Sequence, residues 1–277
     1  MLGAIIGDIV GSRFEWNNHK DKHFELFTED CRMTDDSIMT FAVAKALMET
    51  EKVSELGNND YYPLLARMSI RYMQEFGRHF PDCGFSRAFF QWILSDDPQP
   101  YNSFGNGAAM RISPVAYVGR TEKEIQCLSE AVTGVSHNHE EGLKGAEATA
   151  TAIYMARSGS SKVEIRTEIE NEYYPLNFTL DGIRDSYRFT TDCQATVPQA
   201  IVAFLESTSF EDAIRNAVSL GGDSDTLAAI AGAIAGAIAE AHYGIPKDIQ
   251  KRALSYIDKG ILSIHEEWVR FINTRNR

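Results

Sequence analysis

Residues 221–237 read GGDSDTLAAIAGAIAGA. The two leading glycines permit a tight turn, and each of the four polar residues after them can cap the start of a helix. Alanine, isoleucine and two further glycines follow, and their small side chains allow neighbouring helices to approach closely. We therefore predict a buried core helix over residues 225–242. Its uninterrupted apolar run, 227–239, would be about 20 Å long, short of the roughly 30 Å of a bilayer's hydrocarbon core, so we expect no membrane span.

Apolar residues recur at helical spacing through most of the chain, whereas no alternating run of convincing length indicates a strand. The composition, 44% hydrophobic and 24% charged, is that of an ordinary globular protein. We predict an all-α fold, a single compact domain that spans residues 1–277. The other expected helices cover 37–50, 62–75, 86–94, 121–133, 143–157, 196–206, 210–219 and 247–272, the last broken near Gly260. The expected loops are 17–32, 98–107 and 177–197.

Two short acidic clusters precede predicted helices. Residues 34–37 read TDDS and residues 223–226 read DSDT, so each cluster has two carboxylates and a threonine hydroxyl. If the fold brings them together, they form an oxygen-only pocket of the kind that binds Mg²⁺ or Mn²⁺. Without cations or protons, the four carboxylates would repel one another strongly. Helix capping alone is the alternative, because Asp, Ser and Thr are favoured at helix starts.

Three further segments carry candidate functional groups. Residues 105–107 read GNG, a turn whose backbone N–H groups would suit an anion, although an ordinary turn has the same sequence. His137 and His139 lie two residues apart and would either bind a metal or form hydrogen bonds. Glycines at positions 3, 7 and 11 share one helical face, which predicts tight backbone packing. Glu15 then follows the C-terminal end of that helix, where it is either a functional carboxylate or a surface residue.

The bulk properties exclude several classes of function. The formal net charge of −12 argues against a broad surface for nucleic acid or anionic membranes. The N-terminal segment has no basic leader and Asp8 interrupts its apolar run, so we expect no signal peptide. The cysteines match neither a zinc site nor a disulfide framework, so we expect reduced thiols and a cytoplasmic protein. They are Cys31, Cys83, Cys127 and Cys193.

Five segments, in this order, resemble the ADP-ribosylglycohydrolase family. This family includes the dinitrogenase reductase-activating glycohydrolase and the ADP-ribosyl-arginine and ADP-ribosyl-serine hydrolases. The resemblance implies an all-α fold of orthogonally packed helices around a binuclear centre of Mg²⁺ or Mn²⁺. The segments are GAIIGDIVGSRFE at 3–15, TDDS at 34–37, GNGAAMRISPVAY at 105–117, SHNHEEG at 136–142 and GGDSDTLAAIAGAIAGA at 221–237.

The resemblance also implies roles for individual residues. Glu15 matches a glutamate near the metals and the scissile bond, which makes it the expected general acid or base, with Asp36 as the second choice. His137 matches a histidine near the ligand, with His139 as the competing assignment. Asp82 matches, less closely, an acidic residue of arginine-directed members. The loop expected to cradle a diphosphate contains Ser103, Gly105, Asn106 and Gly107. The expected metal ligands are Thr34, Asp35, Asp36, Asp223, Asp225 and Thr226.

The function implied by the resemblance is metal-dependent hydrolysis of the glycosidic bond that joins ADP-ribose to an acceptor. The acceptor would be a protein side chain such as arginine or serine, or a small conjugate. The expected partners are an ADP-ribosylated protein or ADP-ribose conjugate and a cognate ADP-ribosyltransferase, and loops 16–33 and 177–196 are expected to select the acceptor. The alternative is a non-catalytic ADP-ribose-binding or structural protein, since this fold is reused as a lens crystallin. The presence of every expected ligand together with Glu15 favours the hydrolase.

Overall fold

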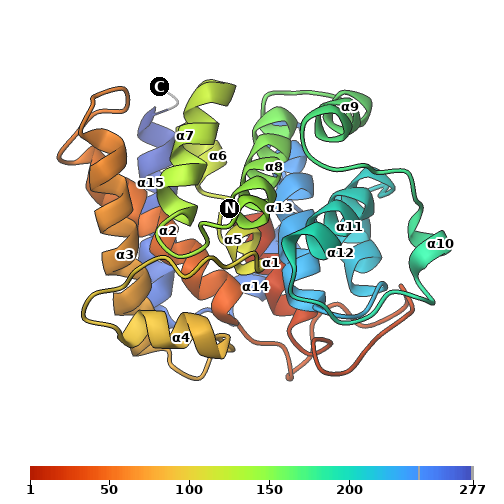
Figure 1. Cartoon of the computed structure of the whole chain (residues 1–277). Helices are drawn as coiled ribbons and strands as arrows, with labels where there is room; N and C mark the ends of the chain where they lie inside the picture. Colours follow the sequence, from red (N-terminus) through yellow and green to blue (C-terminus); the bar gives the residue numbers. More distant parts are fainter. Residues whose placement is uncertain (243, 276–277) are drawn as a thin grey trace.

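The structure, a computed structural model, describes residues 1–242 and 244–275. Within them the chain forms fifteen α-helices, one isolated β-bridge and no strand, so the predicted all-α single domain is confirmed (Figure 1). The helices are α1 (Leu2–Gly11), α2 (Asp35–Glu51), α3 (Tyr61–His79), α4 (Arg87–Leu94), α5 (Gly107–Met110), α6 (Val115–Val118), α7 (Glu122–Thr133), α8 (Glu140–Arg157), α9 (Lys162–Glu172), α10 (Leu180–Ile183), α11 (Cys193–Leu205), α12 (Phe210–Val218), α13 (Ser224–His242), α14 (Lys247–Leu254) and α15 (Lys259–Arg275).

Helices α1 and α13 pack against each other along a seam of small residues. A methyl group placed on Gly7 of α1 would overlap the carbonyl oxygen of Ala228 in α13. One placed on Gly11 would lie 2.5 Å from the Cα of Asp225. The predicted tight packing of this glycine face is therefore confirmed. The seam holds the C-terminal end of α1 beside the N-terminal end of α13, where the second acidic cluster lies.

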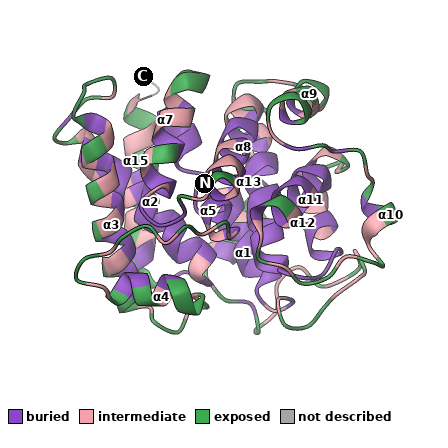
Figure 2. Ribbon diagram, in the orientation of Figure 1, coloured by how far each residue is buried: buried purple, intermediate pink, exposed green. Residues whose placement is uncertain are grey.

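The other helices enclose this pair. Helices α8, α11 and α12 pack against α13, and α2 packs against α1, α3 and α15. Figure 2 shows buried residues concentrated in the central helices and exposed residues on outer helices such as α3, α4 and α9. By length and composition α13 could cross a membrane, but 83% of its most apolar window is buried inside the protein. It is accordingly the core helix that the sequence predicts.

Several boundaries differ from the sequence predictions. The break expected near Gly260 is confirmed but lies slightly earlier, because α14 ends at Leu254 and α15 begins at Lys259, so that Gly260 itself lies in the first turn of α15. The expected loop 177–197 contains α10 and the first turn of α11. Apolar periodicity does not reveal α9, which has few buried residues. Its sequence signal is local: the Ser161 side chain and Glu164 cap the helix reciprocally.

Candidate active site and metal centre

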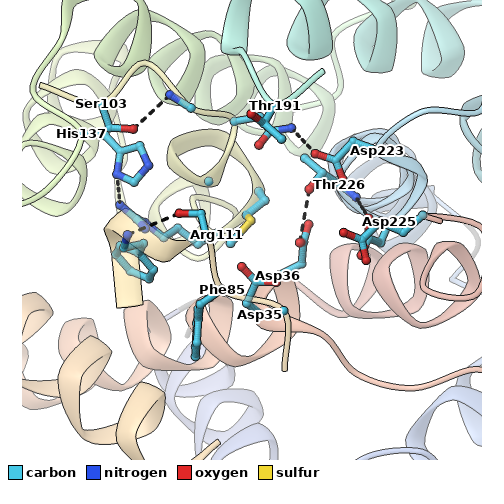
Figure 3. Close-up of a pocket in the computed structure, with 18 of the residues that line it drawn as sticks. Asp35, Asp36, Phe85, Ser103, Arg111, His137, Thr191, Asp223, Asp225 and Thr226 are labelled. Atoms are coloured by element: carbon cyan, nitrogen blue, oxygen red, sulfur yellow. Dashed lines mark hydrogen bonds between the residues drawn. The ribbon is translucent and has the colours of Figure 1, made fainter. Parts of the chain in front are cut away.

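A pocket of about 360 Å³ opens where the starts of α2, α5 and α13 meet (Figure 3). One side is acidic and contains residues of both acidic clusters; the other contains the turn at 103–107. Of the first-choice residues predicted for the site, all but Thr34 line this pocket; the alternatives Asp82 and His139 do not. The acidic side consists of Glu15, Asp35, Asp36, Asp223, Asp225 and Thr226, and the opposite side includes Ser103, Gly105, Asn106, Gly107 and His137.

Thr34 is buried at the start of α2, where it accepts a hydrogen bond from the backbone N–H of Asp36 and so caps the helix. Its hydroxyl donates to Asp8 of α1 at 2.6 Å, and its backbone N–H donates to the same carboxylate at 3.0 Å. Ser37 bonds this carboxylate through both its N–H and its hydroxyl. Asp8 therefore fixes the first turn of α2 against α1 and orients the acidic cluster.

Two groups of three carboxylates have oxygens within 4.8 Å of one another. The first group joins Asp8, Asp36 and Asp225, and the second joins Glu15, Asp223 and Asp225. Thr226 donates its hydroxyl to Asp36 Oδ2 at 3.2 Å, but Asp36 Oδ1 is buried without a partner in the described part of the chain. A buried carboxylate oxygen without a donor fits a cation. This oxygen-only set suits hard divalent ions such as Mg²⁺ or Mn²⁺.

Residues outside the acidic clusters form hydrogen bonds with Asp223 and Asp35. Asp223 accepts a hydrogen bond of 2.6 Å from the Asn106 side-chain amide, which also donates to Thr196. Asn106 was expected to face a diphosphate, but its side chain instead connects α5 with the start of α13. Asp35 lines the pocket outside the two groups of three, and its backbone N–H donates to the Cys83 carbonyl at 3.0 Å.

Burial raises the pKa of every acidic-side carboxylate, because the charged form is desolvated and its neighbours carry the same charge. Burial, reinforced by Asp225, raises the pKa of Glu15 to about 7. Burial also raises the pKa of Asp223 to about 6, and those of Asp35, Asp36 and Asp225 rise as well. A carboxyl group with a pKa near 7 can both hold and release a proton at physiological pH.

The turn at 103–107 is pinned to the chain before α11. An isolated antiparallel bridge joins Gly105 and Asp192, and Asn106 N–H donates to the Thr191 carbonyl at 2.7 Å. The N–H of Gly105 is also occupied, since it donates to Ser103 Oγ at 3.2 Å. Two of the N–H groups expected to face an anion are therefore bonded within the protein. The Ser103 hydroxyl and His137 remain on this side of the pocket.

The two histidines occupy different environments. His137 is buried, lines the pocket and accepts a hydrogen bond from Arg111 at Nδ1. His139 lies outside the pocket lining and caps α8 by accepting from the N–H of Glu141. The structure therefore places His137 rather than His139 in the pocket. Asp82, two residues from the pocket-lining Gly84, is exposed and is not part of the lining.

Sequence reasoning missed two charged residues at the site, Asp8 and Arg111. Asp8 had a visible signal, since it is the one charge within the apolar segment 2–11 and lies one residue beyond Gly7 on the glycine face. Arg111 lies in the middle of segment 105–117 but carried no signal of its own. Its buried position becomes apparent only when α4 and the segment preceding α8 pack around it.

Comparison with known proteins identifies the family. The ADP-ribosylglycohydrolase family model matches residues 1–272. The chain is 25% identical to the ADP-ribosylhydrolase ARH3 of Homo sapiens, over 95% of this chain and 90% of that protein. It is 26% identical to the ADP-ribosylarginine hydrolase Tri1 of Pseudomonas putida (strain GB-1), over 92% of this chain and 73% of that protein.

A solved structure shares the fold. It is described as an ADP-ribosylglycohydrolase-related protein complex and superposes with a TM-score of 0.65 at 22% identity, covering 97% of this chain and 96% of that chain. The resemblance suggested by the five sequence segments is thus confirmed by a family match that extends over nearly the whole sequence. This chain belongs to the ADP-ribosylglycohydrolase family.

Proposed function

We propose that this protein hydrolyses the glycosidic bond between ADP-ribose and an acceptor and releases free ADP-ribose. The observation that carries the proposal is the meeting of both acidic clusters with Glu15 on one side of a single pocket. Family membership supports it, as do the activities named for the relatives ARH3 and Tri1.

The proposed cofactors are two divalent cations, Mg²⁺ or Mn²⁺. When bound, they would orient the hydroxyls of the distal ribose and a water molecule. The orphaned oxygen of Asp36 and the two groups of three carboxylates support this assignment. The proposed ligands are Asp35, Asp36, Asp223, Asp225 and Thr226, which line the pocket, and Thr34, which would have to give up its bond to Asp8 to reach a metal.

Residues of the chain are proposed to transfer the proton, stabilise the transition state and bind the diphosphate. Glu15 is the proposed general acid or base, because its carboxylate lines the pocket within 4.8 Å of those of Asp223 and Asp225, beside the proposed metal centre. Asp36 is the second candidate for that role. The acidic side would also stabilise the positive charge of an oxocarbenium-like transition state. On the opposite side, Ser103, Gly107 and His137 would receive the diphosphate.

Loops 16–33 and 177–196 are proposed to select the acceptor, since both reach the pocket. Lys20 of the first loop donates to the carbonyls of Arg184 and Tyr187 in the second, at 2.7 and 2.9 Å. The exposed Trp16 stacks on Phe189 with ring centroids 5.2 Å apart, and both line the pocket. Arginine and serine linkages both fall within the proposal, and the relative Tri1 is named for arginine.

The proposed partners are an ADP-ribosylated protein or ADP-ribose conjugate and a cognate ADP-ribosyltransferase. A cytoplasmic location is also proposed. It is supported by four cysteines that are all free in the structure.

The decisive experiment measures free ADP-ribose released from arginine- and serine-linked ADP-ribosyl peptides in Mg²⁺, Mn²⁺ or excess EDTA. Metal-dependent release from one peptide is the expected result, and it names the linkage. Protein that binds Mn²⁺ yet releases ADP-ribose from neither peptide would contradict hydrolysis of these linkages and support the non-catalytic alternative.

A further inference from the structure

The pocket is strongly asymmetric in charge. Five carboxylates line one side, whereas Arg111 is the only Lys or Arg among the described lining residues. Arg111 is also fully buried and is the largest side chain with essentially no exposure. A buried guanidinium is expected to pair with a carboxylate. Arg111 forms no ion pair with any described carboxylate, and its Nε and Nη1 atoms have no partner.

The one occupied nitrogen of Arg111 bonds the residues that precede α8. Its Nη2 donates to Ser136 Oγ at 2.8 Å and to His137 Nδ1 at 3.1 Å. The Ser136 hydroxyl also lies 2.8 Å from His137 Nδ1. The Phe89 ring covers the guanidinium, with its centroid 5.1 Å from Cζ. The guanidinium is thus held in one place, with its N–H directed at the imidazole.

This contact decides the tautomer of His137. A guanidinium only donates hydrogen bonds and stays protonated in proteins, so its contact with Nδ1 is a hydrogen bond only when Nδ1 accepts; the Ser136 hydroxyl can either donate or accept and is compatible with that arrangement. A proton on Nδ1 would face the N–H of Arg111, and the ring proton must therefore lie on Nε2. Nε2 lies over the glycine turn, because a methyl group placed on Gly107 would be 3.3 Å from it, and one on Gly105 would be 3.7 Å away.

We propose that Arg111 is a positioning residue that fixes His137 as the Nε2–H tautomer and thereby aims an N–H donor at the turn of residues 103–107. The receiving group would be an anionic oxygen of the ligand, such as a phosphate. This step rests on the proposed function, because that function supplies a diphosphate for this side of the pocket. Glycine at both positions leaves room for such a ligand beside Nε2.

The surroundings of His137 agree with a neutral ring. Burial and the charge of Arg111 together hold the pKa of His137 well below its usual range. Tyr101 also packs on the ring, with ring centroids 5.7 Å apart. His139, in the same segment as His137, instead packs on Phe104. A neutral Nε2–H donor therefore persists through the physiological pH range.

The first test reads the tautomer directly in the wild-type protein. Long-range ¹H–¹⁵N spectra of histidine-labelled protein are recorded between about pH 6 and 8, and His137→Gln assigns the signal. A neutral Nε2–H ring across this range is expected. An Nδ1–H ring, a mixture, or a cation at the acidic end would overturn the proposal. No substrate is needed, so this result stands apart from the success or failure of the proposed hydrolase activity.

The second test changes Arg111 and uses ADP-ribose as the probe. Arg111→Met should let the tautomers mix and weaken ADP-ribose binding about tenfold, the effect of losing one hydrogen bond to a charged group. Its KM should rise more than its kcat falls, because His137 and Arg111 lie across the pocket from Asp223 and Asp225 (Figure 3). Arg111→Lys, which keeps a donor, should restore part of the affinity. Arg67→Met, on the exposed face of α3, is the control.

The outcomes distinguish the positioning role of Arg111 from the proposed hydrolase function. A folded Arg111→Met protein with an unchanged His137 spectrum and unchanged ADP-ribose affinity would refute the positioning role. Wild-type protein that neither binds nor releases ADP-ribose would refute the proposed function, while the tautomer measurement would still be decisive for Arg111. If Arg111→Met fails to fold, the wild-type spectrum tests the tautomer, and the His137 spectrum and ADP-ribose affinity of Arg111→Lys test the positioning role.

Discussion

The backbone of Gly7 lies directly against the carbonyl oxygen of Ala228, with no room for a methyl group between them. This contact sets the distance between α1 and α13. It also sets the distance between Asp8, one residue along α1, and Asp225, at the start of α13, whose carboxylates belong to one group of three. The same contact therefore sets both the packing of α1 on α13 and the spacing of carboxylates in the acidic site.

Gly7→Ala should therefore destabilise the fold and disturb the site together. Overpacking a core costs about 1–3 kcal/mol, and here the obstructing atom is backbone, so we expect at least about 2 kcal/mol. Urea unfolding measures the loss, and calorimetry with Mn²⁺ should show weaker binding. Gly260→Ala, exposed in the first turn of α15, is the control and should be neutral or slightly stabilising. Equal stability of Gly7→Ala and wild type would contradict the tight packing of α1 on α13 at this position.

Asp225→Asn should weaken Mn²⁺ binding and abolish hydrolysis together, because Asp225 belongs to both groups of three carboxylates. Calorimetry gives the affinity, and ADP-ribose release gives the rate. Asp248→Asn, at an exposed position of α14, should change neither. Unchanged Mn²⁺ affinity in Asp225→Asn would remove this residue from the ligand set.

Glu15→Gln should lower the rate of hydrolysis by about 10²–10⁴-fold, the usual contribution of one positioned proton-transfer group. Mn²⁺ binding should partly survive, since the other carboxylates remain. The comparison variant is Glu55→Gln, an exposed residue between α2 and α3. Near-full activity of Glu15→Gln would exclude Glu15 from proton transfer.

Asp8→Asn should destabilise the start of α2, because an amide nitrogen would face the N–H and hydroxyl donors of Thr34 and Ser37. An unsatisfied buried donor costs about 1–3 kcal/mol. Mn²⁺ affinity should fall as the first turn of α2 loses its anchor on α1. Circular dichroism during urea unfolding and calorimetry measure the two effects. A variant with wild-type stability and affinity would show that Asp8 does not orient the cluster.

Metal-free protein should lose stability as the pH rises from about 4 to about 7. The pKa values of Glu15 (about 7) and Asp223 (about 6) lie above the roughly 4 of unfolded carboxylates. The folded state then binds more protons than the unfolded state in this window, so the free energy of unfolding falls as the pH rises. Tm in EDTA should follow this trend, and Mn²⁺ should reverse it.

The control for this prediction is the Glu15→Gln, Asp225→Asn double variant, which has two fewer titrating groups. Its Tm in EDTA should depend less steeply on pH than that of wild type. Equal slopes for the two proteins would show that other groups cause the pH dependence.

Local sequence signals determined the helical content and the position of the acidic clusters. Periodicity and capping depend on residues three or four positions apart, so they placed most helices, including α13 behind its double glycine. They also showed that 34–37 and 223–226 stand at helix starts, which the structure confirms. The same signals failed for α9 and for the four-residue helices, because few apolar positions repeat there.

Only the tertiary structure decided which distant groups meet. Asn106 turns its amide to Asp223, and Arg111 turns its guanidinium to His137, although neither contact has a spacing that a sequence pattern could show. The physical reason is that propensity and periodicity act within a few residues, whereas these contacts depend on how whole helices pack. The sequence by itself therefore determined the elements and the donor types of the site. The packing of α1 on α13 decided that they form one pocket.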